Sequence, residues 1–301
     1  MTGSFIAKDN KVAEFNANNP LPEQKYDVTK IVLPPASYHH EIAKFESRLP
    51  AAANYAKENN IDLSIKKVVE TTSREFNSDE VIGDDVKIAL AEYQTHGRGR
   101  GSKVWQSANS SGICLSVFSR INYRGIPLGL SVYMGVVIVD SLEKIGFKDI
   151  KLKWPNDLFY NGSKLGGILI ELTQNKFGDL IVNFGLGINY SLPDDFYKLI
   201  EEKYKPIDLV SIKNSHEHSR SKTIGFLLPE IINSIKNYDR KSIKEIKARW
   251  NELDQFYGQE IKINLGDRSI KGINKGIDSE GALLLKDGTT IRHIISGQID
   301  L

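Results

Sequence analysis

Short apolar segments typical of β-strands dominate the chain between residues 86 and 188, with one long apolar helix among them. The helix is predicted at Leu128–Leu142, and a hairpin turn is predicted at Asn161-Gly162. The strand segments are Val86–Tyr93, Ile113–Phe118, Ile150–Trp154, Lys164–Leu172 and Leu180–Ile188. Because strands outnumber helices and hairpin signals are present, we predict an α+β fold, a mixed sheet with helices on one face.

The regions on either side of this segment differ from it in character. Residues 1–60 are polar and then helix-like, and we assign them to an N-terminal extension of unknown role. Residues 61–253 form the predicted main domain, which ends in a stretch, Ile224–Trp250, that is helical by its period. Residues 254–301 contain short strands separated by glycine turns and are predicted to form a small β-barrel. These strands are Ile261–Leu265, Ser269–Ile277 and Ala282–Leu285.

Charge and cysteine content exclude several classes of protein. The formal net charge of the 301 residues is +2, so bulk electrostatics does not favour nucleic acid or an acidic membrane surface. The single cysteine, Cys114, lies in an apolar run, which indicates a buried packing role and excludes a disulfide framework within the chain. No apolar stretch reaches the length of about 18 residues that spans a bilayer. We therefore expect a cytoplasmic protein without a membrane partner.

A glycine-rich basic segment, Gly97-Arg98-Gly99-Arg100-Gly101-Ser102-Lys103, is the first candidate for chemistry. Alternating glycines let backbone N–H groups approach a ligand closely, and the cationic side chains among them favour an anion. The spacing is neither that of a Walker A loop nor that of a dinucleotide fingerprint. Two interpretations of this segment therefore remain: a solvated basic loop and an anion-binding site.

Three further motifs follow at turns and strand ends. They are Lys153-Trp154-Pro155-Asn156-Asp157-Leu158, Lys164-Leu165-Gly166-Gly167-Ile168-Leu169 and Gly185-Leu186-Gly187-Ile188-Asn189. Taken singly, an Asn-Asp turn, an edge lysine and a glycine bulge explain each of them without a ligand. The occurrence of these motifs in this order and at this spacing, together with the glycine-rich segment, is far more specific than any one motif alone.

Taken together, the four motifs resemble the signatures of biotin–protein ligases, over about residues 65–301. The tail, with Arg249-Trp250 and then Gly276 to Leu285, is similar to the SH3-like domain that ends bacterial members. The resemblance implies a catalytic domain related to class II aminoacyl-tRNA synthetases at residues 61–253. It also implies a C-terminal SH3-like β-barrel at residues 254–301.

The activity implied by this resemblance is ATP-dependent conversion of biotin to biotinyl-5'-AMP and transfer of biotin to a lysine of a biotin carboxyl carrier protein. ATP, Mg²⁺ and biotin are the implied small molecules, with Mg²⁺ bound through ATP and not by protein ligands alone. The catalytic candidates are Arg98, Arg100, Lys164 and Asp157. The biotin-binding candidates are Thr71, Thr72, Gln94, Gly97, Arg98, Lys164, Gly167 and Gly187. The ATP-binding candidates are Arg100, Lys103, Trp105, Asn156 and Asn189.

The sequence departs from the family pattern at two places in the expected site. Ser73 ends the run Glu70-Thr71-Thr72-Ser73, where the family has a longer side chain, and Gly101-Ser102 replaces a more basic stretch. Residues 1–60 lack the pattern of a winged helix-turn-helix, so we expect no nucleic-acid partner. The fold allows a homodimer formed by pairing of sheet edges.

Three other functions are consistent with parts of the sequence. A lipoate ligase or octanoyltransferase shares the fold and also passes a carboxylic acid to a lysine. A biotin-sensing transcription factor would need a DNA-reading element. A non-catalytic module would use residues 97–103 only to hold phosphate and would release no pyrophosphate.

Overall fold

The chain forms two compact units, residues 1–35 and 36–301. The first contains an antiparallel hairpin of β1 (Gly3–Ala7) and β2 (Lys11–Phe15). The second contains all other elements. The computed structural model describes residues 3–7, 11–15, 49–108, 111–123, 125–194, 196, 205–212, 219–239, 241–266 and 268–300. The N-terminal extension assigned to residues 1–60 lies largely outside this described part.

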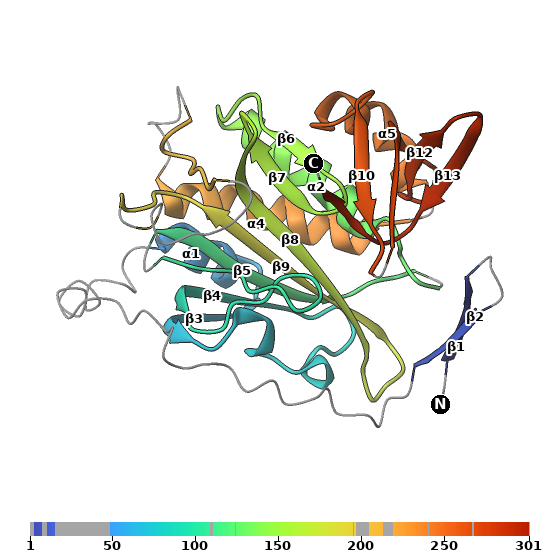
Figure 1. Ribbon diagram of the computed structural model, residues 1–301. Coiled ribbons are helices and arrows are strands. Elements are labelled where there is room, and N and C mark those ends of the chain that lie inside the picture. The colour runs from blue at the N-terminus through green and yellow to red at the C-terminus, as the bar shows by residue number, and fades with distance from the viewer. Residues whose placement is uncertain are drawn as a thin grey trace. The chain divides into compact units, whose positions relative to one another are not determined.

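A seven-stranded mixed sheet forms the centre of the larger unit (Figure 1). The strands are β3 (Asp62–Val69), β4 (Val86–Gln94), β5 (Gly112–Arg120), β6 (Lys151–Lys153), β7 (Asp157–Tyr160), β8 (Ser163–Gln174) and β9 (Leu180–Asn189). Their order is β3-β4-β5-β9-β8-β7-β6. β3 and β4 run parallel, and each other neighbouring pair in this sheet runs antiparallel. The predicted mixed sheet is confirmed.

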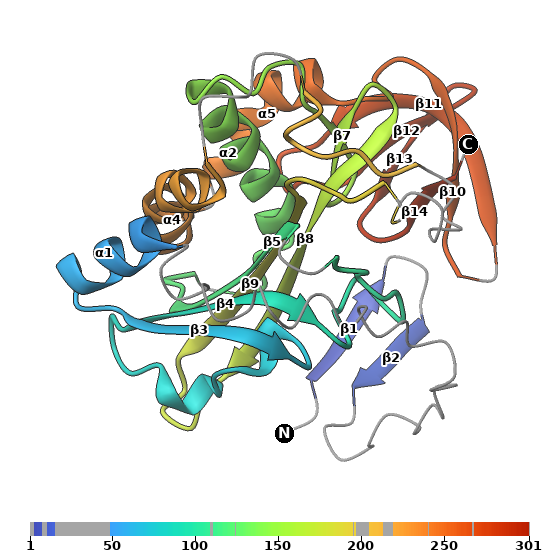
Figure 2. The ribbon, with the colours of Figure 1, turned by 90° about the vertical axis from the view of Figure 1, so that its left-hand side faces the viewer.

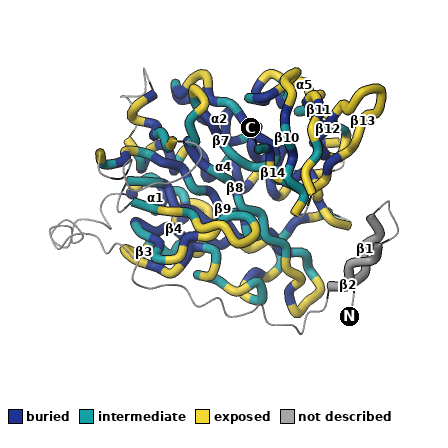
Figure 3. The backbone as a smooth tube through the Cα atoms, viewed as in Figure 1, coloured by how far each residue is buried: buried dark blue, intermediate teal, exposed yellow. Residues whose placement is uncertain are grey.

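Helices cover one face of this sheet, as predicted. They are α1 (Pro50–Glu58), α2 (Leu130–Lys144), α4 (Arg220–Asn237) and α5 (Ser242–Leu253). α1, α2 and α4 lie on one side of the sheet (Figure 2), where the apolar face of α2 buries Met134 and Ile138. The central strands β4, β5 and β9 are buried along most of their length (Figure 3). Of the helices described, none is both long and apolar enough to cross a bilayer.

The predicted continuous helix from Ile224 to Trp250 is wrong, because the chain breaks between α4 and α5. The Asp239 carboxylate accepts hydrogen bonds from the backbone N–H groups of Lys241 and Ser242, at 2.7 and 3.0 Å. These bonds satisfy N–H groups that have no partner inside α5, and they lower the pKa of Asp239. Helical period alone does not reveal such a break, because both helices are amphipathic.

The predicted hairpin from Ile150–Trp154 to Lys164–Leu172 lacks one strand that the structure contains. β7 lies between β6 and β8, and the turn at Asn161-Gly162 joins β7 to β8. The chain reverses at Pro155-Asn156, where the backbone N–H of Asn156 donates to the carbonyl of Lys153 at 3.1 Å. Asp157 therefore stands at the beginning of β7, directly after a tight turn.

Residues 260–300 form a five-stranded antiparallel sheet, consistent with the predicted SH3-like domain. Its order is β13-β12-β11-β10-β14. The strands are β10 (Glu260–Asn264), β11 (Ser269–Ile277), β12 (Leu283–Asp287), β13 (Thr290–Ile294) and β14 (Gln298–Asp300). The hydrophobic core is continuous between this sheet and the main domain, since buried Ile263 and Leu283 belong to the same cluster as Trp154 and Trp250.

A tight contact joins the C-terminal sheet to the turn that carries Asp157. The indole N–H of Trp154 donates to the carbonyl oxygen of Gly281 at 3.1 Å, and both groups are buried. Gly281 has a φ of +84°. A Cβ added there would lie 2.7 Å from the Cα of Gly129, so only glycine allows the two backbones to approach this closely.

We expect Gly281→Ala to destabilise the protein by about 2–3 kcal/mol, because it adds both a positive-φ penalty and a backbone clash. Gly288→Ala is the matched control: its φ is +58°, but no atom lies within 4 Å of the added Cβ. The control should cost only about 1 kcal/mol. Thermal unfolding followed by circular dichroism measures both. Equal losses of stability would show that the contact between Gly129 and Gly281 contributes nothing.

Candidate active site

A cavity of about 620 Å³ opens on the face of the central sheet away from the helices. Leu115 and Val117 on β5 belong to the core beneath the helices, so Ser116 between them points to the opposite face and lines the cavity. Most of the residues predicted from the sequence line this one cavity. They are Thr71, Thr72, Gln94, Arg98, Arg100, Lys103, Trp105, Asn156, Asp157, Lys164, Gly167 and Gly187. The structure therefore brings the four motifs together.

The glycine-rich segment is a tight hairpin. Arg98 forms a β-bridge with Val104, and the backbone N–H of Gly99 donates to the carbonyl of Lys103 at 2.8 Å. Gly101 at the tip has a φ of +62°. Gly97, predicted to bind biotin, is not among the lining residues; a Cβ there would lie 2.3 Å from the carbonyl oxygen of Trp105. Its lack of a side chain lets the base of the hairpin close.

Trp105 packs against the backbone of β9. A Cβ added at Gly187 would lie 2.5 Å from Cε2 of the Trp105 indole, so this glycine is what allows the ring to lie flat against the strand. The Lys164 Nζ lies 5.9 Å from the centroid of the same ring, within the range of a cation–π interaction. The indole thus forms part of the wall of the cavity and contacts one of its cations.

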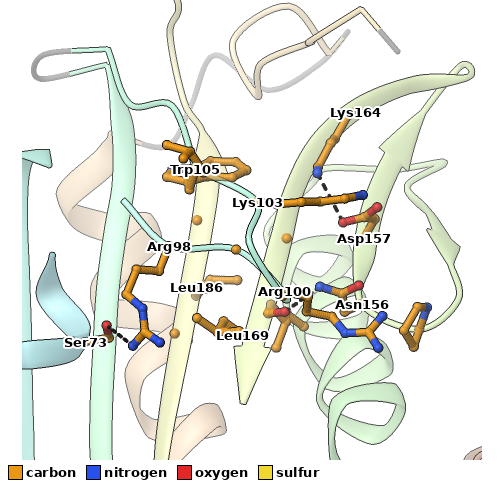
Figure 4. A pocket seen from close by; sticks show the side chains of 18 of the residues that line it. Ser73, Arg98, Arg100, Lys103, Trp105, Asn156, Asp157, Lys164, Leu169 and Leu186 are labelled. Atoms are coloured by element: carbon orange, nitrogen blue, oxygen red, sulfur yellow. Dashed lines mark hydrogen bonds and ion pairs between the residues drawn. The ribbon is translucent and has the colours of Figure 1, made fainter. Parts of the chain in front are cut away.

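Cationic and acidic groups gather at one side of the cavity. Figure 4 shows Lys103, Lys164, Asp157, Asn156 and Arg100 on this side. The Lys164 Nζ lies 3.3 Å from Oδ1 of Asp157, and the Arg100 Nη1 donates to the carbonyl oxygen of Gly297 at 3.3 Å. Burial lowers the pKa of Arg100, and the nearby Asp157 carboxylate opposes that shift. The C-terminal sheet therefore supplies a backbone acceptor to the wall of the cavity.

Arg98 extends to the other side of the cavity. Its guanidinium pairs with the Glu171 carboxylate at 2.8 Å. It also donates to Oγ of Ser73 at 3.4 Å (Figure 4). Asn183 donates to the carbonyl of Ser73 at 2.9 Å. Ser73, which departs from the family pattern, therefore still contacts the glycine-rich hairpin. Sequence reasoning missed Glu171, although a carboxylate within an apolar strand is a signal that could have indicated it.

Thr72, Gln94 and Ser116 form a buried hydrogen-bonded group at the end of the cavity. Oε1 of Gln94 accepts from the backbone N–H of Thr72 at 2.8 Å and from its hydroxyl at 3.2 Å. The Ser116 hydroxyl donates to Oγ1 of Thr72 at 2.9 Å. Cys114 is buried nearby, as predicted; burial raises its pKa to about 12, and the Gln94 side chain partly opposes this shift. Ser116 was missed because no motif includes it.

The two asparagines predicted to bind ATP make hydrogen bonds to backbone carbonyls. Asn156 donates to the carbonyl of Ile168 at 2.7 Å and still lines the cavity. Asn189 donates to the carbonyls of Ile207 at 3.0 Å and Lys164 at 3.4 Å, and it is not a lining residue. Its contact with nucleotide stays a prediction. Over the described ranges, no group of three or more His, Cys, Asp or Glu side chains could hold a metal ion.

Two family models match this chain. The Biotin/lipoate A/B protein ligase family matches residues 65–189, and the Biotin protein ligase C terminal domain matches residues 256–301. The first match contains Thr71, the glycine-rich hairpin, Asp157, Lys164 and Gly187. The second contains Gly297 and the five-stranded sheet.

Similar proteins have been described in several bacteria. The chain is 33% identical over 215 residues to the Bifunctional ligase/repressor BirA of Escherichia coli, a match that covers 70% of this chain and 65% of that protein. It is 27% identical to the Biotin--[acetyl-CoA-carboxylase] ligase of Mycobacterium tuberculosis, over 71% of this chain and 79% of that protein. The chain thus spans less than two thirds of the bifunctional relative.

Among solved structures, the chain is similar to a biotin protein ligase from Aquifex aeolicus in complex with biotin and ATP. The TM-score is 0.64 and the identity is 28%. The alignment covers 79% of this chain and 97% of that one. The similarity therefore extends over nearly the whole of the Aquifex protein.

We expect Gly187→Ala to displace the Trp105 indole, because the added Cβ would lie 2.5 Å from the ring. Acrylamide quenching of tryptophan fluorescence should then increase, since Trp154 and Trp250 are buried and Trp105 is the ring that moves. Gly185→Ala is the matched control on the same strand, where the nearest atom to the added Cβ lies at 3.4 Å. Unchanged quenching in Gly187→Ala would mean that Trp105 does not pack on β9.

Proposed function

Because the chain belongs to the biotin protein ligase family, we propose that it activates biotin with ATP and transfers biotin to a lysine of a carrier protein. One observation carries the proposal: five cationic residues and a single carboxylate line the same cavity. They are Arg98, Arg100, Lys103, Lys153, Lys164 and Asp157. The cavity volume of about 620 Å³ is in the range of small-molecule sites.

The first step joins two anions. The biotin carboxylate oxygen attacks the α-phosphorus of ATP, a P–O bond forms, and pyrophosphate leaves with the electron pair of the broken bond. Two unit charges about 4 Å apart repel by roughly 4 kcal/mol at an effective dielectric constant of about 20. We propose that Arg100, Lys103 and Lys164, which line the same side of the cavity, cancel this repulsion.

The second step transfers the acyl group to an amine. The lysine nitrogen attacks the acyl carbon of biotinyl-5'-AMP, an amide bond forms, and AMP leaves. A free lysine with a pKa near 10.4 is almost entirely protonated at neutral pH, so it must first lose a proton. Asp157, about four-fifths buried and placed directly after the turn at Asn156, is the carboxylate we propose to accept it.

Mg²⁺ is proposed to enter the site with the nucleotide. Within the described part of the chain, Asp157 is paired with Lys164 and has no neighbouring carboxylates that would complete a protein-held metal site. The ATP phosphates would therefore supply most of the ligands. When bound, Mg²⁺ neutralises part of the phosphate charge.

The proposed acceptor is a biotin carboxyl carrier protein or domain of a biotin-dependent carboxylase. The name of the Mycobacterium tuberculosis relative, a biotin–[acetyl-CoA-carboxylase] ligase, supports this choice for the present chain.

We further propose a cytoplasmic location, supported by the single buried Cys114. A homodimer and the absence of a nucleic-acid partner stay predictions from the sequence.

Lipoate is the alternative substrate, since the family model that matches residues 65–189 includes both activities. The match of residues 256–301 to a biotin protein ligase domain favours biotin. Incubation of the protein with ATP and each acid in turn separates the two. Pyrophosphate release that requires lipoate and not biotin would overturn the choice.

We expect Lys164→Ala to reduce biotin-dependent pyrophosphate release by about 10²–10³-fold, because a cation beside the reacting anions is lost. Lys244→Ala, an exposed change on α5 outside the cavity, is the control and should retain full activity. Both rates are measured at saturating ATP and biotin. A wild-type rate in Lys164→Ala would remove this lysine from the reaction.

Arg100→Ala should shorten the lifetime of bound biotinyl-5'-AMP by about 10–100-fold, the effect of losing one charge-assisted contact. Arg98→Ala should also speed release of the adenylate, because both arginines belong to the same hairpin. Release is followed by trapping free adenylate from a preformed complex. If both variants keep the wild-type lifetime, the hairpin does not hold the adenylate.

A further inference from the structure

Ser116 is a fully buried polar residue that lines the cavity but belongs to none of the sequence motifs. It lies in the middle of β5, paired with Gly185 of β9 and Ala89 of β4. Its hydroxyl lies 2.9 Å from Oγ1 of Thr72. A hydroxyl with no exposed surface needs a hydrogen-bond partner, and Thr72 is the partner that the fold supplies.

The direction of the hydrogen bonds in this group is fixed by a backbone N–H. The N–H of Thr72 can only donate, so the Gln94 side-chain atom that faces it at 2.8 Å must be the oxygen Oε1. The Thr72 hydroxyl lies 3.2 Å from the same oxygen and must donate to it. Having used its only proton, Thr72 Oγ1 can only accept from Ser116.

The direction of these hydrogen bonds determines which donors and acceptors the end of the cavity presents to a ligand. Oε1 of Gln94 is occupied by two donors, so the amide presents its N–H groups at Nε2, which lies beside Gly97. The neighbouring Cys114 thiol is only a weak acceptor for these groups. Oγ1 of Thr72 keeps one lone pair. The cavity therefore pairs N–H donors with an adjacent acceptor.

We propose that Ser116 is a positioning residue that fixes this pattern and so makes the end of the cavity selective for a cyclic urea. A urea carries a carbonyl oxygen next to N–H groups, the complement of the donors on Gln94 and the acceptor on Thr72. A dithiolane ring has neither group. The inference rests on the proposed function, in which Thr72 and Gln94 bind the biotin ring, and adds Ser116 as the residue that holds these two side chains in place.

Removal of the Ser116 hydroxyl tests this role. Ser116→Ala should raise the KM for biotin about tenfold, because Thr72 loses its donor and the Gln94 amide is no longer held in one orientation. The maximal rate of pyrophosphate release and the KM for ATP should stay within about twofold of wild type, since the Ser116 hydroxyl bonds Thr72 and not Arg100 or Lys164. Desthiobiotin keeps the urea but lacks the ring sulfur, and its KM should rise by the same factor.

Two further variants separate positioning from a general loss of structure. Ser116→Thr retains the hydroxyl and should restore a KM for biotin near that of wild type. Ser119→Ala removes an equally buried hydroxyl from β5 that bonds only its neighbour, the carbonyl of Arg120, outside the cavity. It should leave the KM for biotin unchanged.

The inference is overturned if Ser116→Ala leaves the KM for biotin unchanged, or if it lowers the maximal rate and raises the KM for ATP by the same factor. Failure of the proposed function is a different result: the wild-type protein would then form no biotinyl-5'-AMP in the same assay.

Discussion

Repulsion between like charges is the constraint on which the structure of the site depends. A cavity that brings two anions together must be lined by cations, and those cations also repel one another. The structure gives each of three cations an oxygen partner. Lys164 pairs with Asp157, Arg98 pairs with Glu171, and Arg100 bonds the carbonyl of Gly297. These oxygen partners hold the three positive charges in place around the cavity.

Two glycines of the motifs allow close contacts that a side chain at either position would prevent. Gly97 allows the basic hairpin to close against Trp105, and Gly187 allows the Trp105 ring to lie on β9. The C-terminal domain contributes two backbone carbonyl oxygens. That of Gly281 accepts a hydrogen bond from the Trp154 indole, and that of Gly297 accepts one from Arg100. In our proposal the catalytic unit therefore includes both matched domains, and the sheet of residues 260–300 supports the residues that act on ATP.

Much of this could be predicted from the sequence, because the strands and glycine motifs have strong local patterns. The mixed sheet and the helices on one face follow from such patterns. The gathering of the cationic residues was implied by the resemblance of the four motifs to a known family. Contacts between distant segments could not be predicted, since nothing near Arg98 in the sequence points to Glu171, and nothing near Thr72 points to Ser116. The break at Asp239 was missed because it depends on one carboxylate that accepts hydrogen bonds from backbone N–H groups at the start of α5. The spacing of apolar residues carries no signal for such bonds.

We propose that this cavity joins biotin to AMP. Mass spectrometry of the purified protein after incubation with biotin, ATP and Mg²⁺ tests it most directly. We predict a species with the mass of biotinyl-5'-AMP, bound to the protein and accompanied by an equal amount of pyrophosphate. Absence of this species with active protein, or its replacement by lipoyl-AMP as the sole adenylate when both acids are supplied, would contradict the claim.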